Sequence, residues 1–301
     1  MSAHGRGPQM SAAEPVVLAR RGGLAITVVP AHGARITQIA DPRGNNWLAD
    51  TGASELLDGA PVEFAGGTRG GWDECLPSVS ACADPNRPGV DIADHGDFWA
   101  APWTVHQLDD DSVTLVGDVP GHPLQVRKTV GLPADRESVQ VDIDIRNRAD
   151  RPYQFLYSAH PLWAFEHDVV VDLPGAGETV PGFGLPDVLP DVSRIAYLGE
   201  RTNYKVFIRW SGRARYSVPA LNSAVSLRQS PEINRWLGVC VNRGAYPNLS
   251  AGDHWVALEP TTAPTDSLAA AVQSGSAAVL QPGGSVRWTT DIEVVHGEAM
   301  R

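Results

Sequence analysis

Two histidines and one glutamate stand beside apolar or aromatic strand-like segments, and together they could move protons. His160 stands in Ser-Ala-His-Pro, Glu259 in Leu-Glu-Pro and His95 in Asp-His-Gly. An imidazole titrates near neutrality and a carboxylate accepts protons, so His160 and Glu259 suit general acid and general base catalysis. Each residue alone would more often be a hydrogen-bonded structural group, so the prediction depends on the combination. The aromatic neighbours indicate a sugar as the molecule on which these residues act.

The two predicted catalytic residues each precede a proline. Residues 155–159 have the composition of a half-buried strand, and Pro161 predicts that regular pairing ends there, which would leave His160 at a strand rim beside a cavity. Glu259 closes the strand-like run 254–258. A buried carboxylate costs several kcal/mol unless it is paired or hydrogen-bonded, which favours a functional acid at this position. The alternative is a structural salt bridge to an arginine.

A glycine-rich segment offers groups that could bind a sugar. Residues 66–77 read Gly-Gly-Thr-Arg-Gly-Gly-Trp-Asp-Glu-Cys-Leu-Pro. The glycines let the backbone turn tightly and approach a ligand. Arg69, Trp72, Asp73 and Glu74 supply a cation, a flat apolar face and two acceptors, so we predict that they bind substrate. The alternative is a surface turn whose tryptophan fills the core.

His95 is a further predicted substrate-binding residue. It precedes an aromatic group at 98–103 and could donate a hydrogen bond to a sugar hydroxyl or ring oxygen, although a structural histidine is an equal interpretation. His95, His106 and His122 do not have the spacing of a compact metal motif, and the three cysteines lack CxxC pairs. Motifs for nucleotide binding and the GxSxG elbow are also absent from the sequence. We therefore predict neither a metal nor a cofactor.

Bulk composition excludes several classes of partner. The chain has 301 residues and is 43% hydrophobic, which is enough for a large core. Its formal charge of -11, from 24 Lys+Arg against 35 Asp+Glu, opposes binding to nucleic acid. No stretch has the roughly 20 apolar residues of a membrane helix, and residues 1–14 read as a flexible tail rather than a signal peptide. We expect a cytoplasmic monomer or homodimer, with one domain over residues 15–301 that binds a small sugar and neither nucleic acid nor membrane.

Period-two alternation of apolar residues dominates the chain and predicts an all-β protein. The segments with this pattern are 24–29, 35–39, 112–116, 124–130, 139–145, 169–173, 205–210, 224–228, 236–241, 254–258 and 286–294. The 30 glycines and 24 prolines leave little room for a long helix. We predict a large antiparallel β-sandwich with one shared core. Two long Gly- and Pro-rich passages, 62–93 and 174–203, are predicted to be binding loops or lids.

Taken in order, a series of short motifs resembles the aldose 1-epimerase family, also called galactose mutarotases. The motifs are Gly-Ala-Arg-Ile-Thr-Gln-Ile (33–39), Gly-Gly-Trp-Asp-Glu-Cys-Leu-Pro (70–77), His95-Gly96, Ser-Ala-His-Pro (158–161) and Leu-Glu-Pro (258–260). The likeness extends from about Leu24 to Val295. It implies a galactose mutarotase-like supersandwich with a sugar cleft across one sheet, no cofactor, and an acid histidine that works with a base glutamate.

The resemblance assigns roles residue by residue. His160 matches the general acid of the family, Glu259 its general base, and His95 the histidine that helps to hold the ring oxygen. Arg69 is the candidate for the arginine that contacts the sugar. The segment Gly-Trp-Asp-Glu (71–74) differs from the corresponding loop of the galactose enzymes, so the resemblance does not identify the sugar.

Three other functions remain open at this stage. The fold could bind or sense a sugar without catalysis, or it could modify a polysaccharide. The substrate could also be a hexose 6-phosphate, with Arg69, Arg201, Lys205 or Arg209 as phosphate partners.

Overall fold

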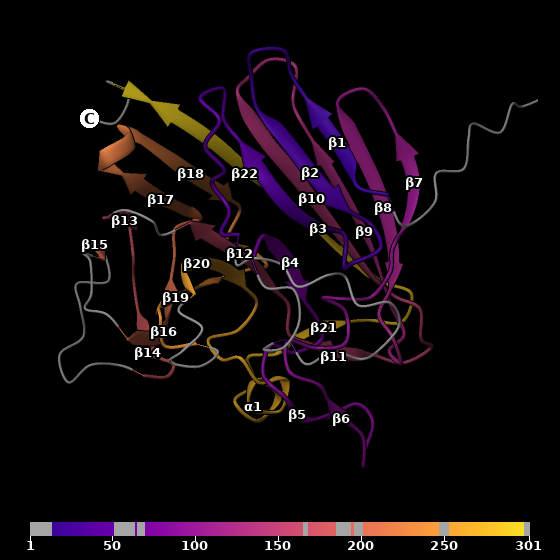
Figure 1. The fold of residues 1–301 in the computed structure, drawn as a ribbon. Helices are drawn as coiled ribbons and strands as arrows, with labels where there is room; N and C mark the ends of the chain where they lie inside the picture. Colours follow the sequence, from indigo (N-terminus) through magenta and orange to yellow (C-terminus); the bar gives the residue numbers. More distant parts are fainter. Residues whose placement is uncertain are drawn as a thin grey trace, which may run out of the picture.

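Two nine-stranded antiparallel sheets form the protein, as a computed structural model shows (Figure 1). The structure describes residues 14–50, 64, 70–164, 168–184, 194–195, 201–246 and 253–297. The first sheet has the order β1 (Val16–Ala19), β2 (Ala25–Val29), β3 (Arg35–Ala40), β4 (Trp72–Cys75), β12 (Ser158–Ala164), β20 (His254–Thr261), β19 (Trp236–Arg243), β16 (Thr202–Arg209) and β14 (Thr179–Pro181). This sheet contains both predicted catalytic residues.

The second sheet faces the first across the core. Its order is β15 (Arg194–Ile195), β13 (Val170–Asp172), β17 (Arg213–Val218), β18 (Ser223–Gln229), β22 (Ser285–His296), β10 (Ser138–Asn147), β9 (Leu124–Gly131), β8 (Ser112–Asp118) and β7 (Thr104–Leu108). Two small ribbons, β5 (Cys82–Ala83) with β6 (Asp91–Ile92) and β11 (Tyr153–Phe155) with β21 (Ala278–Leu280), lie with the helix α1 (Leu268–Gln273) at one end of the sandwich (Figure 1). A 3-10 turn, η2 (Pro219–Leu221), joins β17 and β18.

The all-β sandwich predicted from the sequence is confirmed, because every segment with period-two alternation overlaps a strand. Successive side chains of a strand point to opposite faces of the sheet, and this alternation is visible in the sequence. In β20, for example, Val256 and Leu258 enter the main core, whereas Ala257 and Glu259 lie on the opposite face of the sheet. The core that joins the sheets thus uses one face of each strand.

Three local predictions need correction. Pro161 does not end a strand, because β12 continues to Ala164, and Glu259 lies within β20 rather than at its end. The segment 62–93 is not all loop, since Trp72–Cys75 forms the central strand β4. Its short length and flanking glycines hide its alternation. The predicted lid at 174–203 lies partly outside the described residues, and its described part includes the strands β14 and β15. The predicted N-terminal tail lies outside the described residues except for Glu14.

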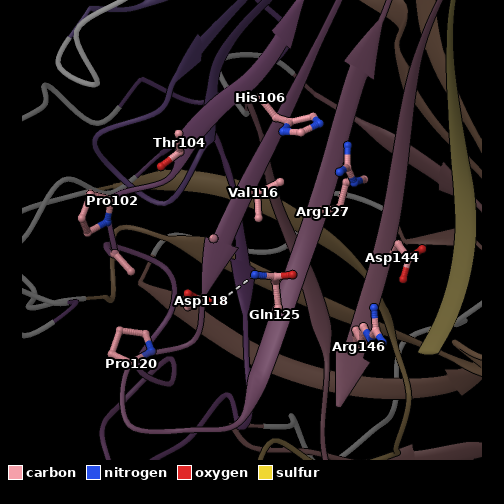
Figure 2. A pocket seen from close by; sticks show the side chains of 12 residues that line it. Pro102, Thr104, His106, Val116, Asp118, Pro120, Gln125, Arg127, Asp144 and Arg146 are labelled. Atoms are coloured by element: carbon pink, nitrogen blue, oxygen red, sulfur yellow. Dashed lines mark hydrogen bonds between the residues drawn. The ribbon is translucent and has the colours of Figure 1, made fainter. Parts of the chain in front are cut away.

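A polar groove of about 770 Å³ lies on the outer face of the second sheet (Figure 2). Side chains of β7, β8, β9 and β10 line it, among them His106, Gln125, Arg127 and Arg146. It is therefore on a different sheet from the predicted catalytic residues. Among the described residues, no helix has the length and apolar content that crossing a membrane requires.

Candidate active site

The register between β12 and β20 places the two predicted catalytic residues opposite each other. Ser158 pairs with Thr261 and Leu162 pairs with Ala257, so the same register sets His160 across from Glu259. Directly opposed residues of an antiparallel pair project their side chains from the same face, about 4.5–5.5 Å apart at Cβ. An imidazole and a carboxylate more than ninety positions apart in sequence thus share one sheet face.

Two prolines interrupt the backbone ladder at this point. Pro161 and Pro260 have no N–H, and the pairing between β12 and β20 shows a gap between Ser158 and Leu162. β12 continues because its other edge still bonds to β4, where the Leu162 N–H donates to Gly71 O at 2.9 Å. His160 and Glu259 therefore face each other across a seam with few backbone hydrogen bonds.

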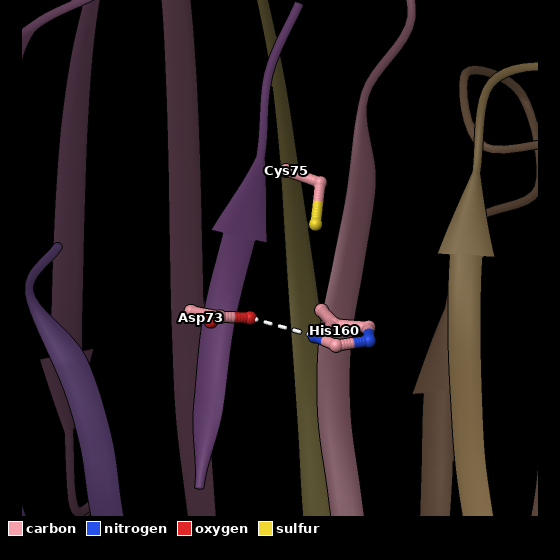
Figure 3. A group of neighbouring side chains, drawn as sticks. All are labelled: Asp73, Cys75 and His160. Carbon is pink, nitrogen blue, oxygen red and sulfur yellow. Dashed lines mark hydrogen bonds and ion pairs between the residues drawn. The ribbon is translucent and has the colours of Figure 1, made fainter. Parts of the chain in front are cut away.

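A buried ion pair orients His160. Its Nδ1 lies 2.8 Å from Oδ1 of Asp73, the residue that pairs with it on β4 (Figure 3). The other oxygen of Asp73 accepts a 2.5 Å bond from Arg35 Nη2, and Arg35 Nη1 donates to Gly70 O at 2.7 Å. Because Asp73 occupies Nδ1, His160 Nε2 is the ring nitrogen left to exchange a proton with a ligand.

The charges in this cluster favour protonated His160. Burial alone would lower the pKa of His160, but the Asp73 carboxylate outweighs it and the pKa lies above its ordinary value. Burial alone would raise the pKa of Asp73, but Arg35 and His160 together hold that pKa well below its usual range. The result is an imidazolium beside a carboxylate, which is the state a general acid needs.

A second ion pair holds Glu259. Its Oε2 accepts a 2.6 Å bond from Lys205 Nζ, and the Ser158 hydroxyl lies 3.3 Å from the same oxygen. Lys205 also donates to Asp266 Oδ1 at 2.6 Å. Burial alone would lower the pKa of Lys205, but Asp266 and Glu259 raise it above its ordinary value. The lysine is therefore a buried cation shared by two carboxylates.

His95 lies beside His160, as the sequence predicted for a substrate-binding residue of the same site. The two imidazole centroids are 5.1 Å apart, and the Phe64 ring stacks on His95 at 3.5 Å. His95 Nδ1 is 3.0 Å from Asp94 Oδ2. Burial is the main cause that lowers the pKa of His95 below its ordinary value, so this imidazole is neutral near pH 7. The two histidines thus carry different protonation states.

Trp72 and Glu74, which were also predicted to bind substrate, do not join this cluster. On β4, Asp73 points toward His160, and alternation turns Trp72 and Glu74 to the opposite face. Trp72 is part of the main core. Glu74 forms a 2.8 Å ion pair with Lys128 of the second sheet and accepts a hydrogen bond from Tyr157. Arg69 lies outside the described residues.

Arg35, Lys205 and Gly238 are site residues that the sequence interpretation missed or placed elsewhere. Arg35 is fully buried at the start of β3, and its signal in the sequence is a cation at the first position of a predicted strand. Lys205 was considered only as a phosphate partner, but its ammonium already binds two carboxylates. Gly238 of β19 pairs with Glu259 of β20 and leaves space for the Lys205 side chain.

Three potential metal ligands lie together at the site. One ligand atom each of Asp73, Cys75 and His160 lies within 4.8 Å of the others (Figure 3). Burial raises the pKa of the Cys75 thiol well above its ordinary value, whereas a metal binds the thiolate. Arg35 and His160 occupy both oxygens of Asp73. The donor set fits a hydrogen-bonded cluster better than a metal centre, and the absence of a metal stays a prediction.

Comparison with known proteins finds similar folds at low sequence identity. No family model and no curated protein matches the chain. A structure named "Putative aldose 1-epimerase" from Escherichia coli K12 is 18% identical, with a TM-score of 0.72 over 94% of this chain and 99% of that one. A galactose mutarotase related enzyme from Lactobacillus acidophilus is 14% identical, with a TM-score of 0.70 over 94% and 97%. An aldose epimerase homologue from C. elegans is 13% identical, with a TM-score of 0.61 over 94% and 99%.

These identities are too low to transfer an activity, but the overlap covers nearly the whole of each chain. The architecture implied by the sequence motifs is therefore confirmed. The chain has the galactose mutarotase-like fold, shared with structures named for aldose 1-epimerases and galactose mutarotases.

Proposed function

We propose that the protein is an aldose 1-epimerase, which interconverts the α and β anomers of an aldose. The observation that carries this proposal is the pair of His160 and Glu259 at facing positions on one sheet face, each with its own buried counterion. The names of the structural neighbours support the same reaction class. The proposal needs neither a metal nor a nucleotide.

The reaction follows from the protonation states of the two residues. Glu259 removes the proton from the anomeric hydroxyl while the His160 imidazolium donates a proton from Nε2 to the ring oxygen. The bond between the anomeric carbon and the ring oxygen breaks, and the product is an open-chain aldehyde. The aldehyde rotates about its bond to the next carbon, and the hydroxyl attacks its other face. His160 then takes back its proton and Glu259 returns one to the new anomeric oxygen.

His95 supplies a group that His160 cannot. A neutral imidazole has one N–H and one acceptor nitrogen. Because Nδ1 of His95 faces the Asp94 carboxylate at 3.0 Å and carries the N–H, its Nε2 is left to accept a hydrogen bond from a sugar hydroxyl. Its ring lies 5.1 Å from that of His160, close enough for both to contact one sugar. We propose that His95 binds a sugar hydroxyl next to the ring oxygen, while Asp73 acts through His160 rather than on the sugar.

The test is anomer exchange measured by NMR over free and phosphorylated hexoses, followed by polarimetry on variants. His160→Asn and Glu259→Gln should each reduce the rate by about 10²–10⁴, because each proton transfer contributes that much. Matched controls are His106→Asn and Glu293→Gln on the second sheet, which should keep the wild-type rate.

Two results would contradict the proposal. Near wild-type rates in either site variant would remove the acid–base assignment. Sugar binding by calorimetry without any acceleration of anomer exchange would indicate a non-catalytic sugar-binding protein instead.

A further inference from the structure

Lys205 is a buried cation that the proton transfers described above do not use. Its side chain is 3% exposed, and its Nζ lies 2.6 Å from both Glu259 Oε2 and Asp266 Oδ1. An ammonium has three hydrogens, and these two carboxylates occupy two of them. A lysine held in this way is poorly suited to binding a phosphate group, and its short contact with the proposed base indicates a role toward Glu259.

The strand next to Glu259 is built to admit this lysine. Lys205 reaches the carboxylate from β16 across β19, over the position of Gly238. A Cβ at Gly238 would lie 3.0 Å from Lys205 Cε, 3.3 Å from Glu259 Cβ and 3.4 Å from Glu259 Oε2. Any larger residue would therefore push the two partners apart, which makes the glycine part of the arrangement.

Asp266 connects the lysine to the segment that carries His95. The Asp266 carbonyl accepts hydrogen bonds from Val79 N at 2.9 Å and Ser80 N at 2.8 Å, while its carboxylate holds Lys205. Val79 O in turn accepts a hydrogen bond from the His95 N–H. One residue thus joins the lysine beside the proposed base to the backbone of His95, the proposed ligand of a sugar hydroxyl.

We propose that Lys205 is a positioning residue for this reaction, and that it fixes the Glu259 carboxylate so that Oε1 receives the anomeric proton. The proposal rests on the proposed function. Both hydrogen bonds that described residues make to this carboxylate reach Oε2, from Lys205 and Ser158. These hydrogen bonds fix the position of Oε2 and restrict rotation about the Cγ–Cδ bond, which leaves Oε1 to receive the proton. Misplacement of a reacting group by about 1 Å costs on the order of 10²-fold in rate.

The chain offers a matched control for this lysine. Lys128 forms a similar buried pair with Glu74 at 2.8 Å, on the opposite face of the first sheet and away from His160. Lys205→Met and Lys128→Met each remove one buried ammonium, so both should lower the melting temperature. Only Lys205→Met should lower kcat per folded molecule, by about 10²-fold with little change in KM.

Two further measurements distinguish positioning from general damage. Lys205→Arg should recover part of the lost kcat, because it restores a cation to the carboxylates. A crystal structure of Lys205→Met should show the Glu259 carboxylate rotated, whatever the activity of the variant.

The outcomes separate the two proposals. A kcat within threefold of wild type in Lys205→Met, or equal losses in Lys205→Met and Lys128→Met, would overturn the positioning role and leave the epimerase function intact. No anomer exchange by the wild-type protein would overturn both. If Lys205→Met does not fold, Gly238→Ala is the second variant, and a wild-type kcat there would count against the proposal.

Discussion

Replacement of Asp73 by asparagine isolates the charge that keeps His160 protonated. The substituted amide oxygen can still accept the hydrogen bond from Nδ1 of His160, so the ring keeps its orientation. What is lost is the negative charge, while the Arg35 guanidinium that pairs with Asp73 stays in place. The pKa of His160 should therefore fall, and the general acid should lose its proton at a lower pH than in the wild type.

The distance sets the scale of this change. Two unit charges 2.8 Å apart, the separation of His160 Nδ1 and Asp73 Oδ1, interact by about 6 kcal/mol at an effective dielectric constant of 20. Arg35 already offsets much of this field from 2.5 Å on the other oxygen. We expect the alkaline limb of the kcat profile to move down by about 1–2 pH units, or about 1.4–2.7 kcal/mol. At a pH above the wild-type limb the rate should then fall about 10- to 100-fold, with near recovery on the acidic side.

The assay is polarimetry from pH 5 to pH 9 on protein whose folded fraction is measured by circular dichroism. The variant leaves the Arg35 guanidinium without its carboxylate, which costs about 3–5 kcal/mol of stability for a buried pair. The control is Asp41→Asn, another buried carboxylate, which accepts hydrogen bonds from Asn45 and Trp47. It should lower stability without moving the limb. An unmoved alkaline limb in Asp73→Asn would refute the proposed link between Asp73 and His160.

The remaining predictions concern stability, local geometry and metal dependence. Because the folded pKa of Asp73 lies below its unfolded value, its pairing stabilises the protein above about pH 4 and is lost as pH falls. Between pH 5 and pH 2, the free energy of unfolding measured in urea should therefore fall more for the wild type than for Asp73→Asn. The pKa of His160 is raised in the folded protein, so its contribution to stability is complete below about pH 6.5 and is lost at higher pH. Urea unfolding of His160→Asn at the same pH values should not show this loss. Gly96→Ala should lower both the melting temperature and kcat, because Gly96 has a φ of 75° and a Cβ would lie 2.4 Å from Leu76 O, in the turn after His95. Dialysis against a chelator should leave the exchange rate unchanged, and a loss restored by zinc would contradict the hydrogen-bonded interpretation of the cluster.

The sequence was sufficient to predict the sandwich but not the order of its strands. Alternation is a local property, and it exposes strands such as β9 and β20 directly. The pairing of β4 with β12 joins segments that are far apart in the chain, and no local pattern encodes it. The short strand β4, flanked by glycines, was missed for this reason, although its alternation would have separated Asp73 from Trp72 and Glu74 once the strand was recognised.

The proposed acid and base could be found in sequence because histidine and glutamate next to proline are distinctive. Their counterions could not be found in this way. Arg35 meets Asp73 from 38 positions away, and Lys205 meets Glu259 from 54 positions away, so their pairing depends on how segments far apart in the sequence are arranged in the sheet. The prolines were misleading for a related reason. A strand with two neighbours can lose bonds on one edge and continue on the other.

The paired prolines have a consequence for engineering this site. In an ordinary antiparallel pair, reciprocal amide bonds lock the spacing of the two backbones, and side chains must accommodate it. Between β12 and β20 that lock is missing at Pro161 and Pro260, so packing around the seam sets its width. An N–H introduced at position 161 would face the β20 backbone and narrow the gap between His160 and Glu259. The distance between the two side chains can thus be changed by single substitutions within the sheet, without redesign of any loop.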